Sequence, residues 1–276
     1  MFGETRFNVQ QSNEYRYLEF NSEINSAHTL VLLHGMFGGL SNFDPLIDKV
    51  QNQPFFVPEI PIYKYEKDKL SIPELALWLH RALTDHGIRQ PVLLGNSMGG
   101  HIALQYALSH PDNVKALVLT GSSGLFENDL GSSSPKRYDR EYVKERASLT
   151  FYDDLVDETI IDEILEVLQS PAKLSRLLRI ARSTHEHNLE DQLGRIRQPT
   201  LLVWGKNDII TPPHVAETFL EKLPSATLKW IDKCGHAPMM ERPGEFASYL
   251  LDFLKSYHLL SENQKKIRHE EDYTHI

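Results

Sequence analysis

Cysteine is nearly absent from this chain of 276 residues. Cys234 is the only one, so no disulfide can form within the chain, and this suits a reducing compartment. No cysteine or histidine cluster has the spacing of a zinc site. The first ten residues hold no apolar run that could act as a secretory signal, and no segment reaches the length of a membrane span. We therefore expect a cytoplasmic protein without a membrane partner.

Positive charge is scarce relative to negative charge. The chain has 29 lysines and arginines against 38 aspartates and glutamates, which gives a formal net charge of −9. Binding to nucleic acid requires a basic face, and anionic membrane surfaces attract basic segments. The charge therefore argues against both, and we expect the partner to be a small-molecule substrate.

Short apolar runs alternate with helical patterns along most of the chain. The pattern of 15–20 predicts an antiparallel strand, and further strands are expected at 29–33, 55–57, 91–94, 114–120, 200–204 and 227–231. Helices are expected over 41–50, with Ser41 and Asn42 as caps, over 71–83, with Ser71 as cap, and over 101–108 and 243–256. Such alternation indicates an α/β protein with a mostly parallel twisted sheet flanked by helices.

The segment 125–190 has a different sequence pattern from the rest of the chain. It contains polar turns and helical patterns at 159–168 and 172–181, but no β-rich run. We therefore predict a helical cap at 125–190, inserted into an α/β core made of 1–124 and 191–276. The tail 261–276 is charged with little apolar periodicity, and we expect it to be frayed.

The most informative motif is Gly95-Asn96-Ser97-Met98-Gly99-Gly100. A short apolar run precedes it, and a helical pattern follows it. A strand, a Gly-x-Ser-x-Gly turn and a helix together describe a nucleophile elbow, which holds the serine hydroxyl above the edge of the sheet. Taken alone, the motif fits an ordinary tight turn equally well. The role of Ser97 as a nucleophile therefore depends on partners elsewhere in the chain.

An acid and a histidine follow Ser97 at the ends of later strands. Asp208 lies in the turn after the strand expected at 200–204, and His236 follows the strand expected at 227–231. Serine becomes nucleophilic when a base takes its proton, and a third group must orient that base. We assign Ser97 as the nucleophile, His236 as the general base and acid, and Asp208 as the carboxylate that orients His236.

Several of these residues have a simpler interpretation when taken alone. Asp208 could be a turn aspartate or a helix cap before the prolines that follow it, and His236 is one of thirteen histidines. Three such residues in one order at strand ends favour the triad. His34 is expected to shape its loop through hydrogen bonds. His185 and His187 lie two residues apart on a helical pattern, which favours a solvated or cap-lining role over a metal pair.

Acyl transfer places a developing negative charge on the carbonyl oxygen, which needs preplaced N–H donors. The backbone N–H of Met98, directly after the nucleophile, can supply one donor. The glycine-rich loop after His34 should supply the second, from Met36 or else from Phe37. Phe37 is also expected among the substrate contacts.

These motifs resemble those of the α/β-hydrolase superfamily, whose triads follow the chain order serine, acid, histidine. The resemblance covers about 15–257 and implies the α/β-hydrolase fold, with the helical insertion as a lid that carries much of the substrate specificity. It also implies that neither a metal nor an organic cofactor is needed. Haloalkane dehalogenases and epoxide hydrolases of this fold use an aspartate nucleophile, whereas the elbow of this chain holds Ser97.

Within the superfamily, the motifs around Ser97 and His236 are similar to those of the meta-cleavage-product hydrolases. These enzymes break carbon–carbon bonds in dienoic ring-fission products. Asn42 matches a polar position near the oxyanion loop of that family. Arg182 is a candidate for the cap arginine with which these enzymes hold the substrate carboxylate, and several other arginines of the cap compete with it.

The chain also departs from that family. Ala237 stands where a tryptophan usually follows the catalytic histidine, and the loop Met36-Phe37-Gly38-Gly39 is shorter than usual. The segment 58–63 lacks the usual glycine-containing turn. We therefore expect a carboxylic ester hydrolase with a lidded, apolar pocket that acts on a small or medium apolar ester through an acyl-enzyme. A carbon–carbon bond hydrolase and a small-molecule receptor that retains the triad are the alternatives.

Overall fold

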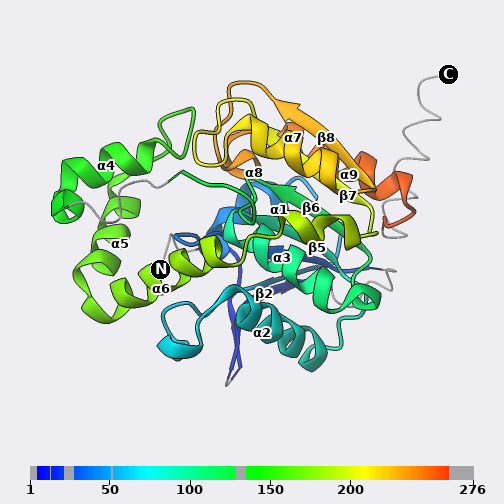
Figure 1. Cartoon of the computed structure of the whole chain (residues 1–276), viewed down its shortest axis with the longest axis horizontal. Coiled ribbons are helices and arrows are strands. Elements are labelled where there is room, and N and C mark those ends of the chain that lie inside the picture. Colours follow the sequence, from blue (N-terminus) through cyan, green and yellow to red (C-terminus); the bar gives the residue numbers. More distant parts are fainter. Residues whose placement is uncertain (1–4, 13, 22–27, 51, 129–134, 261–276) are drawn as a thin grey trace.

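The computed structural model describes residues 5–12, 14–21, 28–50, 52–128 and 135–260. Within these residues, eight strands form one sheet in the order β1-β2-β4-β3-β5-β6-β7-β8 (Figure 1). The strands are β1 (Gln10–Gln11), β2 (Arg16–Phe20), β3 (Leu30–Leu33), β4 (Phe55–Pro58), β5 (Val92–Asn96), β6 (Ala116–Thr120), β7 (Thr200–Gly205) and β8 (Ala226–Ile231). β1 and β2 pair antiparallel, and β2 pairs antiparallel with β4. All pairs from β4 to β8 are parallel, so the predicted sheet is confirmed.

Helices cover both faces of this sheet because successive residues of each central strand point to opposite sides. In β5, Leu93 packs with α2, α3 and α7, whereas Val92 and Leu94 pack with α1, α8 and α9. The helices of these two layers are α1 (Asp44–Ile47), α2 (Ile72–Asp85), α3 (Met98–Ser109), α7 (Pro213–Lys222), α8 (Pro238–Glu241) and α9 (Pro243–Ser256). Parallel strands end at the same edge of the sheet, so the loops after β3, β5, β6, β7 and β8 meet there.

Two predicted helix ends follow local capping rules. The Ser71 hydroxyl accepts the Glu74 N–H at 3.4 Å, and Pro73 occupies the first turn of α2. The helix α9 has the predicted bounds, with a proline as its first residue. Both helices bury their apolar stripe against the sheet.

The helix expected over 41–50 is shorter and starts later. A 3₁₀ turn covers Leu40–Phe43, and α1 follows it. The prediction of Ser41 and Asn42 as caps is wrong, because Gly39 is the N-cap and Asn42 lies inside the turn. Its Oδ1 atom accepts the Gly39 N–H at 2.7 Å. A side chain that can cap a helix can also reach back to the turn before it.

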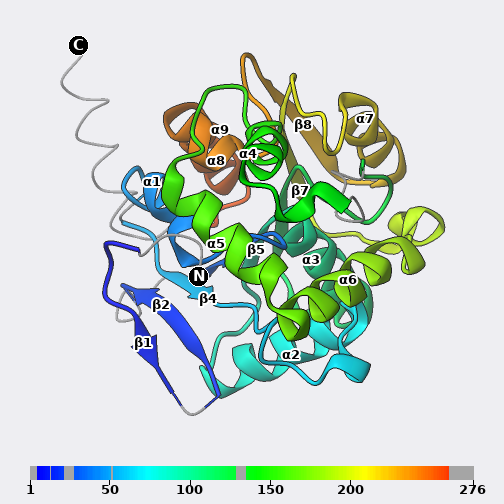
Figure 2. The ribbon, with the colours of Figure 1, turned by 90° about the vertical axis from the view of Figure 1, so that its left-hand side faces the viewer.

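In the described part of the chain between β6 and β7, at the place predicted for the insertion, lie three α-helices. They are α4 (Arg140–Ser148), α5 (Glu158–Gln169) and α6 (Pro171–Glu186). Figures 1 and 2 show them as a group set to one side of the sheet. They share a small apolar cluster of their own, and Met36 and Tyr63 from the sheet side pack against it. The tail 261–276 lies outside the described residues, and none of the described helices is long and apolar enough to cross a membrane.

Candidate active site

Ser97 stands in the sharp turn between β5 and α3. Its φ of 54° and ψ of −122° are strained for a residue with a side chain, and such strain is typical of functional sites. The turn is tight because α3 folds back against the strands. A Cβ at Gly99 would lie 2.1 Å from the Leu33 carbonyl oxygen, and a Cβ at Gly95 would lie 2.4 Å from the Gly100 nitrogen. Only glycine can occupy these two positions, which explains the spacing of the motif.

Asp208 lies buried in the turn after β7, and its carboxylate accepts four hydrogen bonds. The N–H groups of Ile210 and Thr211 donate to Oδ1 at 2.9 and 3.0 Å. The Thr211 hydroxyl donates to Oδ2 at 2.8 Å, and His236 Nδ1 donates to the same atom at 2.9 Å. The carboxylate therefore forms the turn and also orients the histidine, so the two interpretations of Asp208 are compatible.

His236 lies in the loop after β8 and is held at several points. A carboxylate only accepts hydrogen bonds, so Nδ1 carries the proton and Nε2 is left with its lone pair. The His236 carbonyl oxygen accepts from Asn96 Nδ2 at 3.0 Å, which ties the histidine loop to the residue before the nucleophile. Gly121, with a φ of 51°, leaves room for the ring, because a Cβ there would lie 2.7 Å from Nδ1. The structure therefore brings the Ser97 elbow, Asp208 and His236 to one edge of the sheet.

Two glutamates that sequence reasoning missed lie close to His236. Glu241 is buried in α8, and its Oε1 atom accepts the Gly235 N–H at 2.8 Å. Its Oε2 atom accepts the N–H of Tyr152, from the segment between α4 and α5, at 2.7 Å. Glu127 follows β6 and bonds to a core loop and to α6. No local pattern marks either residue, because one partner of each lies far away in the chain.

The electrostatic surroundings raise the pKa of His236. Burial by itself lowers this pKa, since it disfavours the charged ring. The charge of Asp208 and its hydrogen bond act in the other direction, and the charges of Glu127 and Glu241 add to them. The resulting pKa lies above the ordinary value of 6.5. His236 thus becomes a free base only at a higher pH than an isolated histidine.

Of the two residues expected to donate to an oxyanion, Met98 directly follows Ser97 and Met36 lies in a turn beside it. Met98 is the first residue of α3, so its N–H has no acceptor within the helix. Met36 follows β3 in a turn closed by the Gly38 N–H and the Gly35 carbonyl at 3.1 Å. A Cβ at Gly35 would lie 3.2 Å from Ser97 Cβ, so this turn touches Ser97. Phe37, next in the loop, has an exposed side chain.

His34 is buried and shapes the same loop, as expected. Its Nε2 atom accepts the Ile60 N–H at 2.9 Å, so Nδ1 carries the proton and donates to the Gly35 carbonyl at 2.8 Å. Burial lowers the pKa of His34 and keeps the ring neutral, which both hydrogen bonds require. The ring thus fixes the end of β3 from which the loop with Met36 starts.

The remaining predicted site residues lie as follows. Asn42 bonds to the Gly39 N–H and, through Nδ2, to the Met240 sulfur at 3.5 Å. Arg182 is exposed on α6, whose buried residues lie on another face of the helix. His187 ends α6, with Nδ1 within 3.1 Å of the Ser183 hydroxyl. In the part of the chain that the structure describes, no three histidine, cysteine, aspartate or glutamate side chains gather as a metal site would require.

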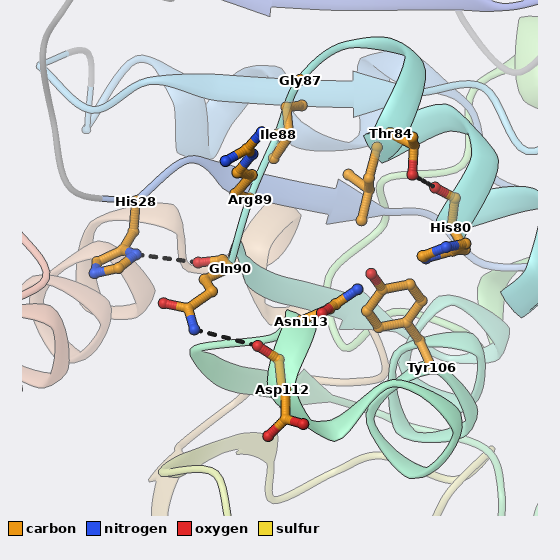
Figure 3. Close-up of a pocket in the computed structure, with 11 residues that line it drawn as sticks. His28, His80, Thr84, Gly87, Ile88, Arg89, Gln90, Tyr106, Asp112 and Asn113 are labelled. Carbon is orange, nitrogen blue, oxygen red and sulfur yellow. Dashed lines mark hydrogen bonds between the residues drawn. The ribbon is translucent and has the colours of Figure 1, made fainter.

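A separate hollow of about 640 Å³ lies away from these residues. His28, Gln90 and Asn113 on its wall come just before β3, β5 and β6, so the hollow lies at the amino ends of the strands (Figure 3). The His28 ring bonds to the Gln90 carbonyl at 3.0 Å. Ser97 lies at the opposite, carboxyl end of β5. In such sheets the ligand site forms at the carboxyl ends, so this hollow is not the candidate site.

Known hydrolases are similar to this chain over most of its length. The Alpha/beta hydrolase family model matches residues 30–249. The uncharacterized hydrolase YugF of Bacillus subtilis is 29% identical over 269 residues, which cover 91% of this chain and 97% of YugF. The 2-hydroxy-6-oxononadienedioate/2-hydroxy-6-oxononatrienedioate hydrolase of Paraburkholderia phymatum is 27% identical over 288 residues, with 90% of this chain and 94% of the relative covered.

Among solved structures, MGS-MChE2 is an alpha/beta hydrolase enzyme from the metagenome of lagoon sediments at Mar Chica, Morocco. It matches with a TM-score of 0.74 and 38% identity, over 90% of this chain and 98% of its own. The α/β-hydrolase fold expected from the sequence is thereby confirmed. The chain belongs to the alpha/beta hydrolase family and is a hydrolase enzyme.

Proposed function

We propose that the protein hydrolyses carboxylic esters with small or medium apolar groups through an acyl-enzyme formed on Ser97. The observation that carries the proposal is the 2.9 Å hydrogen bond between His236 Nδ1 and Asp208. It keeps the proton on Nδ1, so that Nε2 is the free base. The same loop is bonded to Asn96, directly before the nucleophile.

The proposed reaction has two acyl-transfer steps. His236 Nε2 takes the Ser97 hydroxyl proton while Oγ attacks the ester carbonyl, and the oxyanion accepts the Met36 and Met98 N–H groups. The tetrahedral intermediate collapses, the bond to the alcohol breaks, and the alcohol leaves with the proton from His236. Water then gives a proton to His236 and attacks the acyl group. The acid departs, and Ser97 regains its proton.

A carbon–carbon hydrolase is the second candidate. The relative from Paraburkholderia phymatum is named for hydrolysis of a 2-hydroxy-6-oxo dienedioate, and it matches this chain over most of its length. Two features of this chain favour the ester. Ala237 follows His236 where those enzymes usually have tryptophan, and Arg182, the candidate for a carboxylate-binding cap arginine, is exposed.

The test compares p-nitrophenyl butyrate hydrolysis by the wild type, Ser97→Ala and Ser109→Ala. Ser109 ends α3 and is exposed, and its hydroxyl accepts a hydrogen bond from Gln105 Nε2 at 3.2 Å, so it is a matched control. We expect turnover in the wild type and the control and its loss in Ser97→Ala, with unchanged urea unfolding in all three. Full turnover by Ser97→Ala would refute the nucleophile.

Absence of turnover in all three proteins would refute the ester function. A 2-hydroxy-6-oxodienoate substrate then distinguishes the alternatives, because cleavage of its carbon–carbon bond removes the conjugated chromophore. Loss of that absorbance with the wild type alone would identify a carbon–carbon hydrolase. A ligand that binds tightly and is released unchanged would identify a receptor.

A further inference from the structure

Glu127 joins the core to the cap at the edge of the sheet where Ser97 stands. It lies in the loop after β6, and its side chain is half-buried. The Ser123 hydroxyl donates to Oε2 at 2.7 Å, and the Thr184 hydroxyl of α6 donates to Oε1 at 2.5 Å. Both hydroxyl-bearing residues are buried. The carboxylate is therefore held in one place by neutral donors from the core and from the cap.

This carboxylate is close to the reacting groups. The Ser123 N–H donates to the Ser97 carbonyl oxygen at 3.1 Å, so a single residue separates Glu127 from the nucleophile. Its charge also acts on the buried His236 ring. A charge that reaches the general base also acts on a substrate bound between that base and the cap.

The other charged groups around His236 do not neutralise the negative charge of Glu127. The strongest are the carboxylates of Asp208 and Glu241. Asp208 is paired with His236 itself, and Glu241 accepts two backbone N–H groups. On α6, the cap helix that bonds to Glu127, the cations have other positions: Lys173 pairs with Glu166, Arg176 donates to the Tyr65 carbonyl, Arg179 pairs with Glu186, and Arg182 is exposed. The charged groups that act most strongly on His236 are therefore all carboxylates.

We propose that Glu127 is a specificity-determining residue that selects against substrates with a carboxylate, so that the ester taken by this site is neutral or cationic. The inference rests on the proposed ester hydrolysis. A like charge about 12–17 Å away, at the effective dielectric constant of about 20 that holds near a protein surface, lowers binding of an anionic substrate about fivefold to tenfold. A neutral ester of the same shape bears no such penalty. This repulsion also disfavours a dienedioate, which bears two carboxylates.

The experiment uses two pairs of esters that differ in one charge. The first is p-nitrophenyl hexanoate against mono-p-nitrophenyl adipate, with the charge on the acyl side. The second is 4-carbamoylphenyl hexanoate against 4-carboxyphenyl hexanoate, with the charge on the alcohol side. The ratio of kcat/KM, neutral over anionic, is measured for the wild type and for Glu127→Gln. We expect the variant to lower this ratio about fivefold to tenfold in at least one pair, mainly through KM.

Two further variants separate charge from structure. Glu166→Gln removes an exposed cap carboxylate that pairs with Lys173, and it should keep the wild-type ratios. Thr184→Val removes a hydrogen bond to Glu127 but leaves its charge, and it should keep the ratios as well. Ratios in Glu127→Gln that equal those of the wild type in both pairs would overturn the proposal. So would a change of equal size in Thr184→Val.

A binding measurement keeps the proposal testable if the wild type hydrolyses none of the esters. Hexanamide and adipamic acid are unreactive and differ in the same carboxylate, and calorimetry with the wild type and Glu127→Gln compares their affinities. A higher affinity of Glu127→Gln than of the wild type for adipamic acid, with no such gain for hexanamide, supports the selection even if ester hydrolysis fails. An affinity for adipamic acid that is equal in the wild type and in Glu127→Gln would refute the selection, whatever the reaction is.

Discussion

Replacement of Asp208 by asparagine tests the proposed chemistry most directly. The amide oxygen can still accept the N–H groups of Ile210 and Thr211, so the turn is preserved. The amide NH₂ then faces Nδ1 of His236, where the carboxylate oxygen Oδ2 accepts in the wild type. Because an NH₂ group donates, Nδ1 must accept, and the ring proton moves to Nε2. Nε2, the atom that should face Ser97 as the base, then carries a proton.

Asp208→Asn should lower kcat strongly, and it should lower the free energy of unfolding by an amount that depends on pH. A wrong tautomer at a triad histidine costs about 10⁴-fold in kcat. The pKa of His236 is higher in the folded than in the unfolded protein, so the protonated ring stabilises the fold. This contribution is fully present below the unfolded pKa, and it is lost as the pH rises through the folded pKa. Asp208→Asn should therefore cost about 3–5 kcal/mol below about pH 5.5, where it breaks a buried ion pair. At a pH above the folded pKa, where the ring is neutral, the cost falls to about 1–3 kcal/mol.

The assay is steady-state ester hydrolysis, together with urea unfolding at the two pH values. Asp232→Asn is the matched control, because Asp232 is exposed after β8 and pairs with Lys206. It should keep the rate of the wild type. A kcat for Asp208→Asn within about tenfold of the wild type would refute the tautomer argument, as would an equal loss of stability at both pH values.

Three further predictions follow from the same geometry. In the wild type, kcat/KM should rise with pH to a plateau with its midpoint above 6.5, because the raised pKa keeps His236 protonated below it; a flat profile from about pH 8 to pH 5 would contradict this. Gly121→Ala should lower kcat and cost about 1–3 kcal/mol in unfolding free energy, since the added Cβ meets the His236 ring at a positive φ. Gly194→Ala, with open space around it, should cost nothing measurable, and equal unfolding midpoints for the two variants would count against the argument. Glu241→Gln should lower kcat and shift the unfolding free energy by about 1–3 kcal/mol, because an amide cannot accept the N–H groups of Gly235 and Tyr152 together; unchanged kinetics would show that this link does not position His236.

Local chemistry explains why much of the fold could be predicted. A strand buried on both faces is a short apolar run, and a proline-started amphipathic helix such as α9 needs no distant information. The elbow was predictable because close packing of α3 on β3 requires glycine at position 99. The prediction of the N-cap of the helix at 41–50 was wrong. The Asn42 side chain can cap a helix or bond to the preceding turn, and the packing of the folded protein decides between the two.

The sequence by itself determined the strand and helix pattern, the elbow and the chain order of Ser97, Asp208 and His236. Only the tertiary structure decided how the surroundings of the base are built. The Tyr152 N–H meets Glu241 across 89 positions of the chain, and Thr184 meets Glu127 across 57. Such pairs leave no periodic trace in a single sequence, because their two partners lie far apart in the chain and come together only in the folded molecule. The charge around His236 is thus a property of the packed molecule and not of any one segment.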